Sequence, residues 1–250
     1  MDNKCIRVGI VNYLNTLPLL FGLEKMHNAS KIVLIKNYPA AIADDLLNGN
    51  IDAGLIPIAM IPRLKQAYII GNYCISSYDT VASVCLFSQV PIENITTVIL
   101  DYQSRTSVQL VQVLMKQFWK KEVTYLTAKQ NFIADIKDNT AAVIIGDRAL
   151  ENLNYYNYCY DLAEAWMQMT SLPFVFALWV SNKELPAEFI AAFDAANAEG
   201  LQYIEQIVQA QNYTAYDLQK YYTQNICFTM DDARRKSVEL FLSLSDGFSA

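Results

Sequence analysis

Short runs rich in β-branched residues alternate with segments of helical periodicity, and this alternation constrains the fold more than any other feature. In the first part of the chain it predicts strands over residues 6–11, 31–35 and 52–56, with helices over residues 17–26 and 39–47 between them. Parallel strands need crossover connections, and helices of about ten residues supply them. The pattern therefore predicts βαβ units and a largely parallel sheet.

The same alternation recurs further along the chain. It predicts strands over residues 97–100, 123–126 and 141–145, and helices over residues 107–119 and 131–137. This is a second βαβαβ unit. The remainder is predicted to form a helix around residues 164–169, a strand over residues 174–180, and helices over residues 186–211, 215–222 and 231–244.

Two such units, connected by strand-like segments near residues 83–88 and 174–181, are the layout of the type II periplasmic-binding-protein fold. We therefore expect an α/β protein of two lobes with a hinge that the chain crosses twice. Lobe 1 is predicted to comprise residues 1–88 and 175–250, and lobe 2 residues 89–174. Ligands of open α/β sheets bind beyond the carboxyl ends of the strands, so we expect the ligand cleft between the lobes.

The composition argues against several classes of function. A formal net charge of −6 with scattered Lys and Arg disfavours a nucleic-acid partner. The five cysteines contain no C-x-x-C, and the single histidine, His27, has no other ligand at metal-binding spacing, so we expect no metal. No apolar run reaches the roughly 18 residues of a membrane span, and the first residues are charged. We expect a cytoplasmic protein without a membrane partner.

The G-x-G-x-x-G, P-loop and G-x-S-x-G motifs are also absent, which leaves recognition of a small anion by neutral polar groups. The loop after the first predicted strand offers such groups. Tyr13 and Asn15 are candidate ligand contacts at the start of a helix. The simpler alternative is that Asn15 or Thr16 caps this helix, and position alone does not separate the two.

The corresponding loop of the second unit carries Ser104, Arg105, Thr106 and Ser107 directly before an amphipathic helix. Hydroxyl groups, a guanidinium and backbone N–H groups at the positive end of a helix dipole suit a carboxylate or phosphate. An ordinary cap cluster has a similar sequence, but a cap needs only one of these residues. The loop is therefore a candidate anion site.

Further candidates stand where the chain is predicted to enter or leave the cleft. Ser83 precedes the first crossing strand, and Asp147 follows the third strand of the second unit, where it is a candidate base. Thr170 and Phe174, at the return crossing, are candidates to wall an unsaturated ring. Each also has a simpler role, which is backbone support for Ser83, helix capping for Asp147 and core packing for the other two.

Five segments taken together resemble the chorismate dehydratase family, and they keep their order across almost the whole chain. They are VGIVNYLNTLP at residues 8–18, SVCLFS at 83–88, SRTS at 104–107, IGD at 145–147 and LPFVFALW at 172–179.

The resemblance implies conversion of chorismate to 3-[(1-carboxyvinyl)oxy]benzoate with loss of water, the first committed step of the futalosine route to menaquinone, without a cofactor. It also implies that Asn15, Ser83 and residues 104–107 lie at substrate-binding positions. Because no histidine is available and an amide is not a base near neutral pH, we hypothesise that the enolpyruvyl carboxylate of the substrate or Asp147 removes the ring proton. Asn15 would hold the reacting geometry.

Two positions depart from the family pattern. Residues 79–82 read DTVA where Gly-Pro-Val-Arg is common, and Ser171 stands where glycine is common. The first departure removes a basic residue near the hinge.

The main rival function is a solute-binding protein for a small organic carboxylate, since this fold mostly serves binding. The lack of an export signal in the sequence argues against that alternative.

Overall fold

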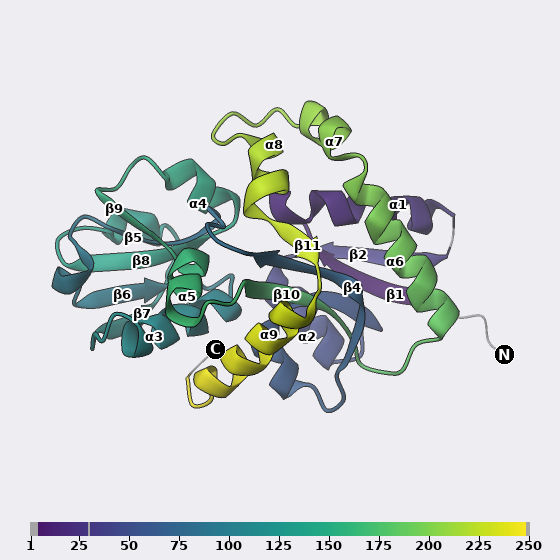
Figure 1. The fold of residues 1–250 in the computed structure, drawn as a ribbon, viewed down its shortest axis with the longest axis horizontal. Helices are drawn as coiled ribbons and strands as arrows, with labels where there is room; N and C mark the ends of the chain where they lie inside the picture. Colours follow the sequence, from purple (N-terminus) through teal and green to yellow (C-terminus); the bar gives the residue numbers. More distant parts are fainter. Residues whose placement is uncertain (1–4, 30, 249–250) are drawn as a thin grey trace.

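The computed structural model describes residues 5–29 and 31–248, and the strands in this part of the chain form two separate sheets (Figure 1). The larger sheet has the strand order β11-β4-β10-β3-β1-β2, and the smaller sheet has the order β7-β6-β8-β5-β9. The larger sheet consists of β1 (Ile6–Val11), β2 (Ile32–Asn37), β3 (Ala53–Pro57), β4 (Tyr68–Ser77), β10 (Phe174–Ser181) and β11 (Cys227–Thr229). The smaller sheet consists of β5 (Val84–Ser88), β6 (Thr97–Leu100), β7 (Thr124–Thr127), β8 (Thr140–Ile145) and β9 (Tyr158–Asp161).

The predicted parallel units are confirmed in both sheets. β1 pairs in parallel with β2 and β3, and β6 pairs in parallel with β7 and β8. The strand that follows each crossing runs the other way, because β10 is antiparallel to β3 and β4, and β5 is antiparallel to β8 and β9. The carboxyl ends of β1, β3, β6 and β8 are therefore the ends at which loops can form a cleft.

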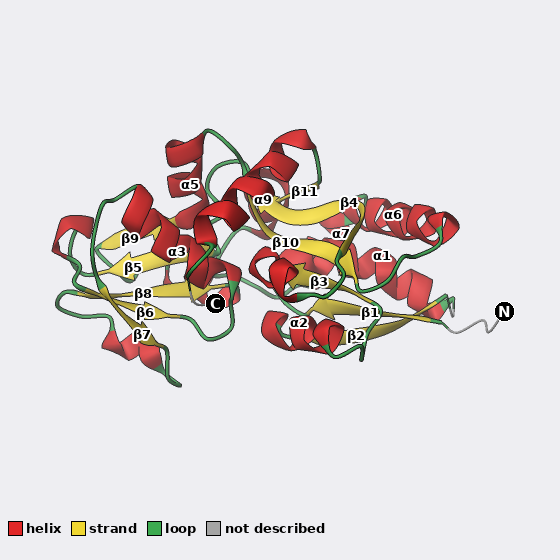
Figure 2. Ribbon diagram, turned by 90° about the horizontal axis from the view of Figure 1, so that it is seen from below, coloured by secondary structure: helices red, strands yellow, loops and turns green. Residues whose placement is uncertain are grey.

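Helices flank both sheets (Figure 2). They are α1 (Leu17–Asn28), α2 (Pro39–Leu47), α3 (Thr106–Gln117), α4 (Asp147–Asn152), α5 (Leu162–Thr170), α6 (Ala187–Leu201), α7 (Ile204–Ala210), α8 (Leu218–Lys220) and α9 (Asp232–Ser245). α1 and α6 pack closely because both carry a glycine at the contact. A Cβ atom on Gly22 would lie 1.8 Å from the carbonyl oxygen of Ala196, and one on Gly200 would lie 1.9 Å from that of Pro18. No helix in the described part of the chain is long and apolar enough to span a membrane.

Several predicted elements differ in extent. The helix expected over residues 131–137 is a 3₁₀ turn over Phe132–Asp135, and the helix expected over residues 186–211 is broken into α6 and α7. The last turn of the helix expected over residues 215–222 continues as a π-helical turn, Tyr221–Asn225. β4, β9 and β11 were not predicted, since Gly71 and Asn72 interrupt the first and the other two are only four and three residues long.

The predicted boundary at residue 88 does not mark the change of sheet. β5 belongs to the smaller sheet, so the chain leaves the larger sheet after Ser77 and returns to it at Phe174. Both crossing segments contain a residue in the left-handed region, Ala82 with φ 61° and Ser171 with φ 59°. Glycine adopts this conformation without a steric penalty, which accounts for the glycine that is common in the family pattern at the position of Ser171.

The return crossing is enclosed by aromatic side chains. Trp166 of α5, Phe174 of β10 and Phe241 of α9 are fully buried and meet edge to face, with ring centroids 5.2–6.0 Å apart. The indole of Trp166 also donates a hydrogen bond to Ser237 Oγ at 3.0 Å. The C-terminal helix thereby packs on the segment that joins the two sheets (Figure 1).

Candidate active site

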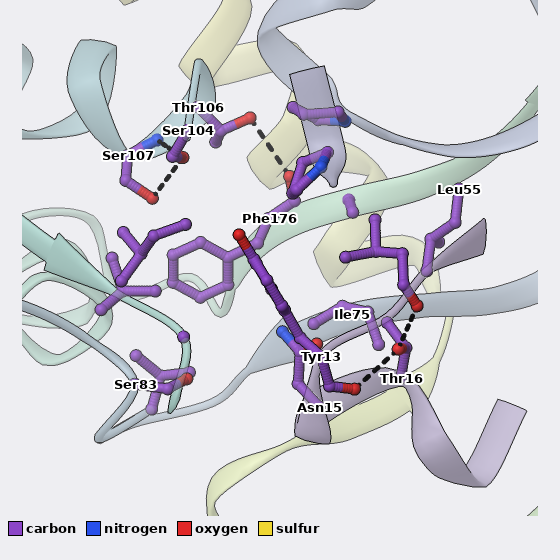
Figure 3. Close-up of a pocket in the computed structure, with 18 residues that line it drawn as sticks. Tyr13, Asn15, Thr16, Leu55, Ile75, Ser83, Ser104, Thr106, Ser107 and Phe176 are labelled. Atoms are coloured by element: carbon purple, nitrogen blue, oxygen red, sulfur yellow. Dashed lines mark hydrogen bonds between the residues drawn. The ribbon is translucent and has the colours of Figure 1, made fainter. Parts of the chain in front are cut away.

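A cavity lies between the two sheets and is lined from both (Figure 3). Its empty volume, including the solvent at its mouth, is about 600 Å³. Among the described residues that line it, none carries a formal charge. The lining residues are Val11, Tyr13, Asn15, Thr16, Pro39, Leu55, Pro57, Ile75, Val81, Ser83, Val84, Ser104, Thr106, Ser107, Ile145, Gly146, Phe176 and Ala177.

Asn15 presents an unpaired amide oxygen in this cavity. It lies in a 3₁₀ turn, Leu14–Thr16, that is fixed by the Thr16 hydroxyl, which lies 2.6 Å from the carbonyl oxygen of Val11 and 2.8 Å from that of Tyr13. Neither Asn15 nor Thr16 makes a side-chain capping bond to the turn or to α1. Oδ1 of Asn15 is buried and has no hydrogen-bond partner among the described residues. The capping alternative is therefore not observed, and the amide is available to a ligand.

Tyr13 connects the two sides of the cleft. Its hydroxyl donates to Oε1 of Gln103 at 2.7 Å, and the same Oε1 accepts a hydrogen bond from Arg148 at 2.8 Å. Arg148 also donates to Oδ2 of the buried Asp101 at 2.6 Å. Burial raises the pKa of Tyr13 to about 12, so this phenol stays a neutral donor. The Tyr13 ring therefore lines the cavity, whereas its hydroxyl proton is donated to Gln103 on the other side of the cleft.

The loop before α3 has an internal hydrogen-bond network. Ser104 Oγ accepts the N–H of Ser107 at 3.0 Å and donates to Ser107 Oγ at 2.8 Å, so Ser104 is the capping side chain. The Thr106 hydroxyl accepts from the N–H of Ala59 at 3.3 Å and donates to the carbonyl oxygen of Phe176 at 3.2 Å. Ser107 Oγ thus already accepts from Ser104, and its own proton is available to a ligand in the cavity.

Ser83 lines the cavity from the first crossing segment. Its carbonyl oxygen accepts from the N–H of Gly146 at 2.8 Å, and its hydroxyl accepts from Tyr221 at 2.7 Å. Gly146 has φ 66°, and a Cβ atom there would lie 3.4 Å from the Tyr13 ring. Glycine at this position suits both the backbone and the close approach of the ring.

Asp147 is placed next to the cavity rather than in its lining. Its Oδ1 accepts the N–H of Leu14 at 3.2 Å, which joins the start of α4 to the turn after β1, and it makes no capping bond to α4. Burial raises the pKa of this carboxyl, and the hydrogen bond from Leu14 acts in the opposite direction. The carboxylate therefore has a contact that the sequence did not indicate.

Besides Asp147, three predicted substrate-binding residues do not line the cavity, namely Arg105, Thr170 and Phe174. The Thr170 hydroxyl donates to the carbonyl oxygen of Trp166 at 2.8 Å at the end of α5, and Phe174 is 0 % exposed in the aromatic core. Phe176 lines the cavity instead (Figure 3). A bulge between Val175 and Ala177 alters the register of β10, so the simple alternation of a strand does not predict which ring faces the ligand.

Gln103, Arg148 and Tyr221 were missed as site residues. Each bonds to a partner far away in the chain: Tyr13 and Gln103 differ by 90 in residue number, Gln103 and Arg148 by 45, and Ser83 and Tyr221 by 138. No local spacing signals such contacts, although the polar loop after the strand Thr97–Leu100 contains Gln103.

Solved structures share this architecture. A protein from Archaeoglobus fulgidus superposes with a TM-score of 0.73 at 14% identity, over 98% of this chain and 97% of the other. A gene product of Candida albicans, described as having the generic periplasmic-binding-protein fold, superposes with a TM-score of 0.66 at 14% identity, over 99% and 92% of the two chains. The chain thus has the α/β fold of periplasmic binding proteins, as predicted.

Sequence comparison is more specific about the family. The family described as menaquinone biosynthesis matches residues 6–246, and the chain belongs to this family. A chorismate dehydratase from Thermus thermophilus is 24% identical, with the match covering 82% of this chain and 80% of the relative. The predicted family resemblance is confirmed.

Proposed function

We propose that this protein is a chorismate dehydratase, a carbon–oxygen lyase that converts chorismate to 3-[(1-carboxyvinyl)oxy]benzoate and water in the futalosine route to menaquinone, in the cytoplasm. Membership of the menaquinone biosynthesis family and similarity to the Thermus enzyme support this proposal. The observation that carries it is the cavity, where the unpaired amide of Asn15 comes from one sheet and the Ser107 hydroxyl from the other.

The anionic substrate is held without a charged side chain in the lining. The ring carboxylate of chorismate binds at the first turn of α3, where Ser107 donates and the helix dipole favours negative charge. Neutral donors suffice because a cavity between two sheets has a lower dielectric than water, which strengthens each hydrogen bond. Phe176 supplies an apolar wall for the ring.

The reaction removes the proton at C3 and the hydroxyl group at C4, which leave together as water while the ring becomes aromatic. Charge that builds on the ring carboxylate as C3 loses its proton is stabilised at the start of α3. Asn15 holds the C4 hydroxyl through its amide. The enolpyruvyl carboxylate is the preferred base, because Asp147 accepts the N–H of Leu14 and lies outside the lining.

Membership in the two sheets supports a division into two lobes. Residues 5–29, 31–77 and 174–248 form the first lobe in this proposal, and residues 84–170 form the second, with the crossings at 78–83 and 171–173 acting as the hinge. The contacts of Tyr13 with Gln103 and of Leu14 with Asp147 would then break when the cleft opens. The substrate would enter in that open state.

The test is to incubate purified protein with chorismate and follow the loss of its absorbance together with formation of the benzoate product by mass spectrometry. We expect a product lighter than chorismate by one water, formed in proportion to protein concentration and absent without protein. Binding of chorismate without turnover would instead support a solute-binding protein for a small organic carboxylate.

A further inference from the structure

Ser83 has a buried neighbour, Tyr221, that takes no part in the proposed reaction. Ser83 is 1 % exposed and lines the cavity, whereas Tyr221 is 0 % exposed and lies behind it in the π-helical turn. The Tyr221 hydroxyl donates to Ser83 Oγ at 2.7 Å. Neither hydroxyl makes another hydrogen bond within the described residues, so the proton of Ser83 is available to a ligand.

Both partners of this hydrogen bond are held in place. The backbone N–H of Ser83 donates to Val81, and its carbonyl oxygen accepts from Gly146. The Tyr221 ring packs against Tyr216 and Tyr222, with ring centroids 6.1 Å and 5.6 Å away. The hydrogen bond therefore joins a residue fixed to the smaller sheet with a ring fixed in the C-terminal segment.

The chemistry of the two hydroxyls sets the direction of the bond. Burial raises the pKa of the Tyr221 phenol well above its ordinary value, so Tyr221 keeps its proton. A serine hydroxyl that accepts one hydrogen bond is polarised and becomes a better donor of its own proton. When a carboxylate occupies the cavity, Tyr221 donates to Ser83 Oγ and Ser83 donates to the carboxylate, so both hydroxyl protons have an acceptor.

We propose that Tyr221 is a positioning residue that fixes the Ser83 hydroxyl as a donor to a carboxylate of the substrate. The proposal rests on the proposed function, because it assigns Ser83 to substrate binding. Tyr221 does not line the cavity and acts only through Ser83. The π-helical turn that carries it fits this role, since such turns are frequent at functional sites.

The test is a double-mutant cycle with Tyr221→Phe, Ser83→Ala and the double variant, measured on KM and kcat for chorismate. Tyr221→Phe keeps the ring contacts and should raise KM about fivefold to tenfold with little change in kcat. Ser83→Ala should raise KM at least as much, and the double variant should match Ser83→Ala alone. The matched control is Tyr222→Phe, because this buried hydroxyl on the same turn has no partner among the described residues, and KM should not change.

An unchanged KM in Tyr221→Phe or in Ser83→Ala, or additive effects in the double variant, would overturn the proposal. Should Tyr221→Phe fail to fold, difluorotyrosine at position 221 keeps the ring and makes the phenol a stronger donor. KM should then fall, and an unchanged KM would overturn the proposal. If wild-type protein shows no turnover, the cycle is measured on the Kd of chorismate. Binding without turnover contradicts only the proposed function, whereas absence of binding contradicts both.

Discussion

The two loops that open the cleft, residues 12–16 after β1 and residues 101–107 after β6, the latter including the first two residues of α3, occupy equivalent places but use their polar groups differently. In the first loop the amide oxygen of Asn15 is buried and has no partner within the described part of the chain. In the second, Asp101 accepts hydrogen bonds from the Gln103 N–H at 3.0 Å and from Arg148, and Ser104 caps α3. The first loop leaves a buried acceptor without a partner among the described residues, whereas Asp101 and Ser104 of the second loop already accept hydrogen bonds within the protein.

The difference indicates a division of labour. A buried acceptor without a partner costs about 1–3 kcal/mol, a cost that a ligand removes when it donates to Asn15. The second loop is preorganised by its own contacts, so it can hold a fixed charge without rearranging. We therefore expect loss of the Asn15 amide to affect turnover and loss of the Ser107 hydroxyl to affect binding.

The largest effect is expected from Asn15→Ala. Loss of the amide should lower kcat by about 100-fold or more, the magnitude typical when one transition-state hydrogen bond is removed, with a smaller change in KM. Asn12→Ala is the matched control, since Asn12 is an exposed asparagine of the same loop. Steady-state kinetics with chorismate decide the point, and an Asn15→Ala enzyme of full activity would remove Asn15 from the mechanism.

Ser107→Ala should act mainly on binding. A hydrogen bond to a charged group contributes about 1.5–3 kcal/mol, so KM should rise about 10-fold to 100-fold while kcat changes less. Ser104→Ala provides the comparison, because loss of a cap lowers the free energy of unfolding by about 1 kcal/mol. Denaturant titration and kinetics of both variants separate the roles. A fall in kcat with unchanged KM in Ser107→Ala would contradict the assignment of binding to this loop.

Tyr13→Phe breaks the contact between the loops while keeping the ring in the lining. Loss of the hydrogen bond to Gln103 should raise KM about twofold to tenfold, because the closed form loses one neutral hydrogen bond. Tyr155→Phe, which removes the hydroxyl of an exposed tyrosine outside the cavity lining, is the control. Equal KM values for Tyr13→Phe and wild type would show that the contact does not support closure.

The smallest effect is expected from Asp147→Asn, which should turn over chorismate at a near wild-type rate if the substrate carboxylate is the base. Its stability should also depend less on pH. The pKa of Asp147 is raised in the folded protein above the ordinary 3.8, so the native state holds this proton more tightly and loses stability as pH rises above that value. Urea titrations between pH 4 and pH 7 compare the two proteins. A large fall in kcat would identify Asp147 as the base instead.

The two loops also show how far the sequence could predict the site. Both loops follow recognisable strands and lead into recognisable helices, so their place at the cleft is a consequence of local pattern. The partners Gln103, Arg148 and Tyr221 depend on contacts between distant segments, which no local pattern encodes. Phe174 was assigned to the cavity in place of Phe176, because the bulge in β10 appears only when the strand is paired.

A crystal structure of the Asn15→Ala variant with chorismate tests the central claim most directly, because slow turnover should keep the substrate intact. We expect its ring carboxylate within hydrogen-bond distance of the Ser107 hydroxyl at the start of α3, its ring against Phe176 and its C4 hydroxyl facing position 15. Chorismate bound outside this cavity, or with its carboxylates away from α3, would contradict the division of roles between the two loops.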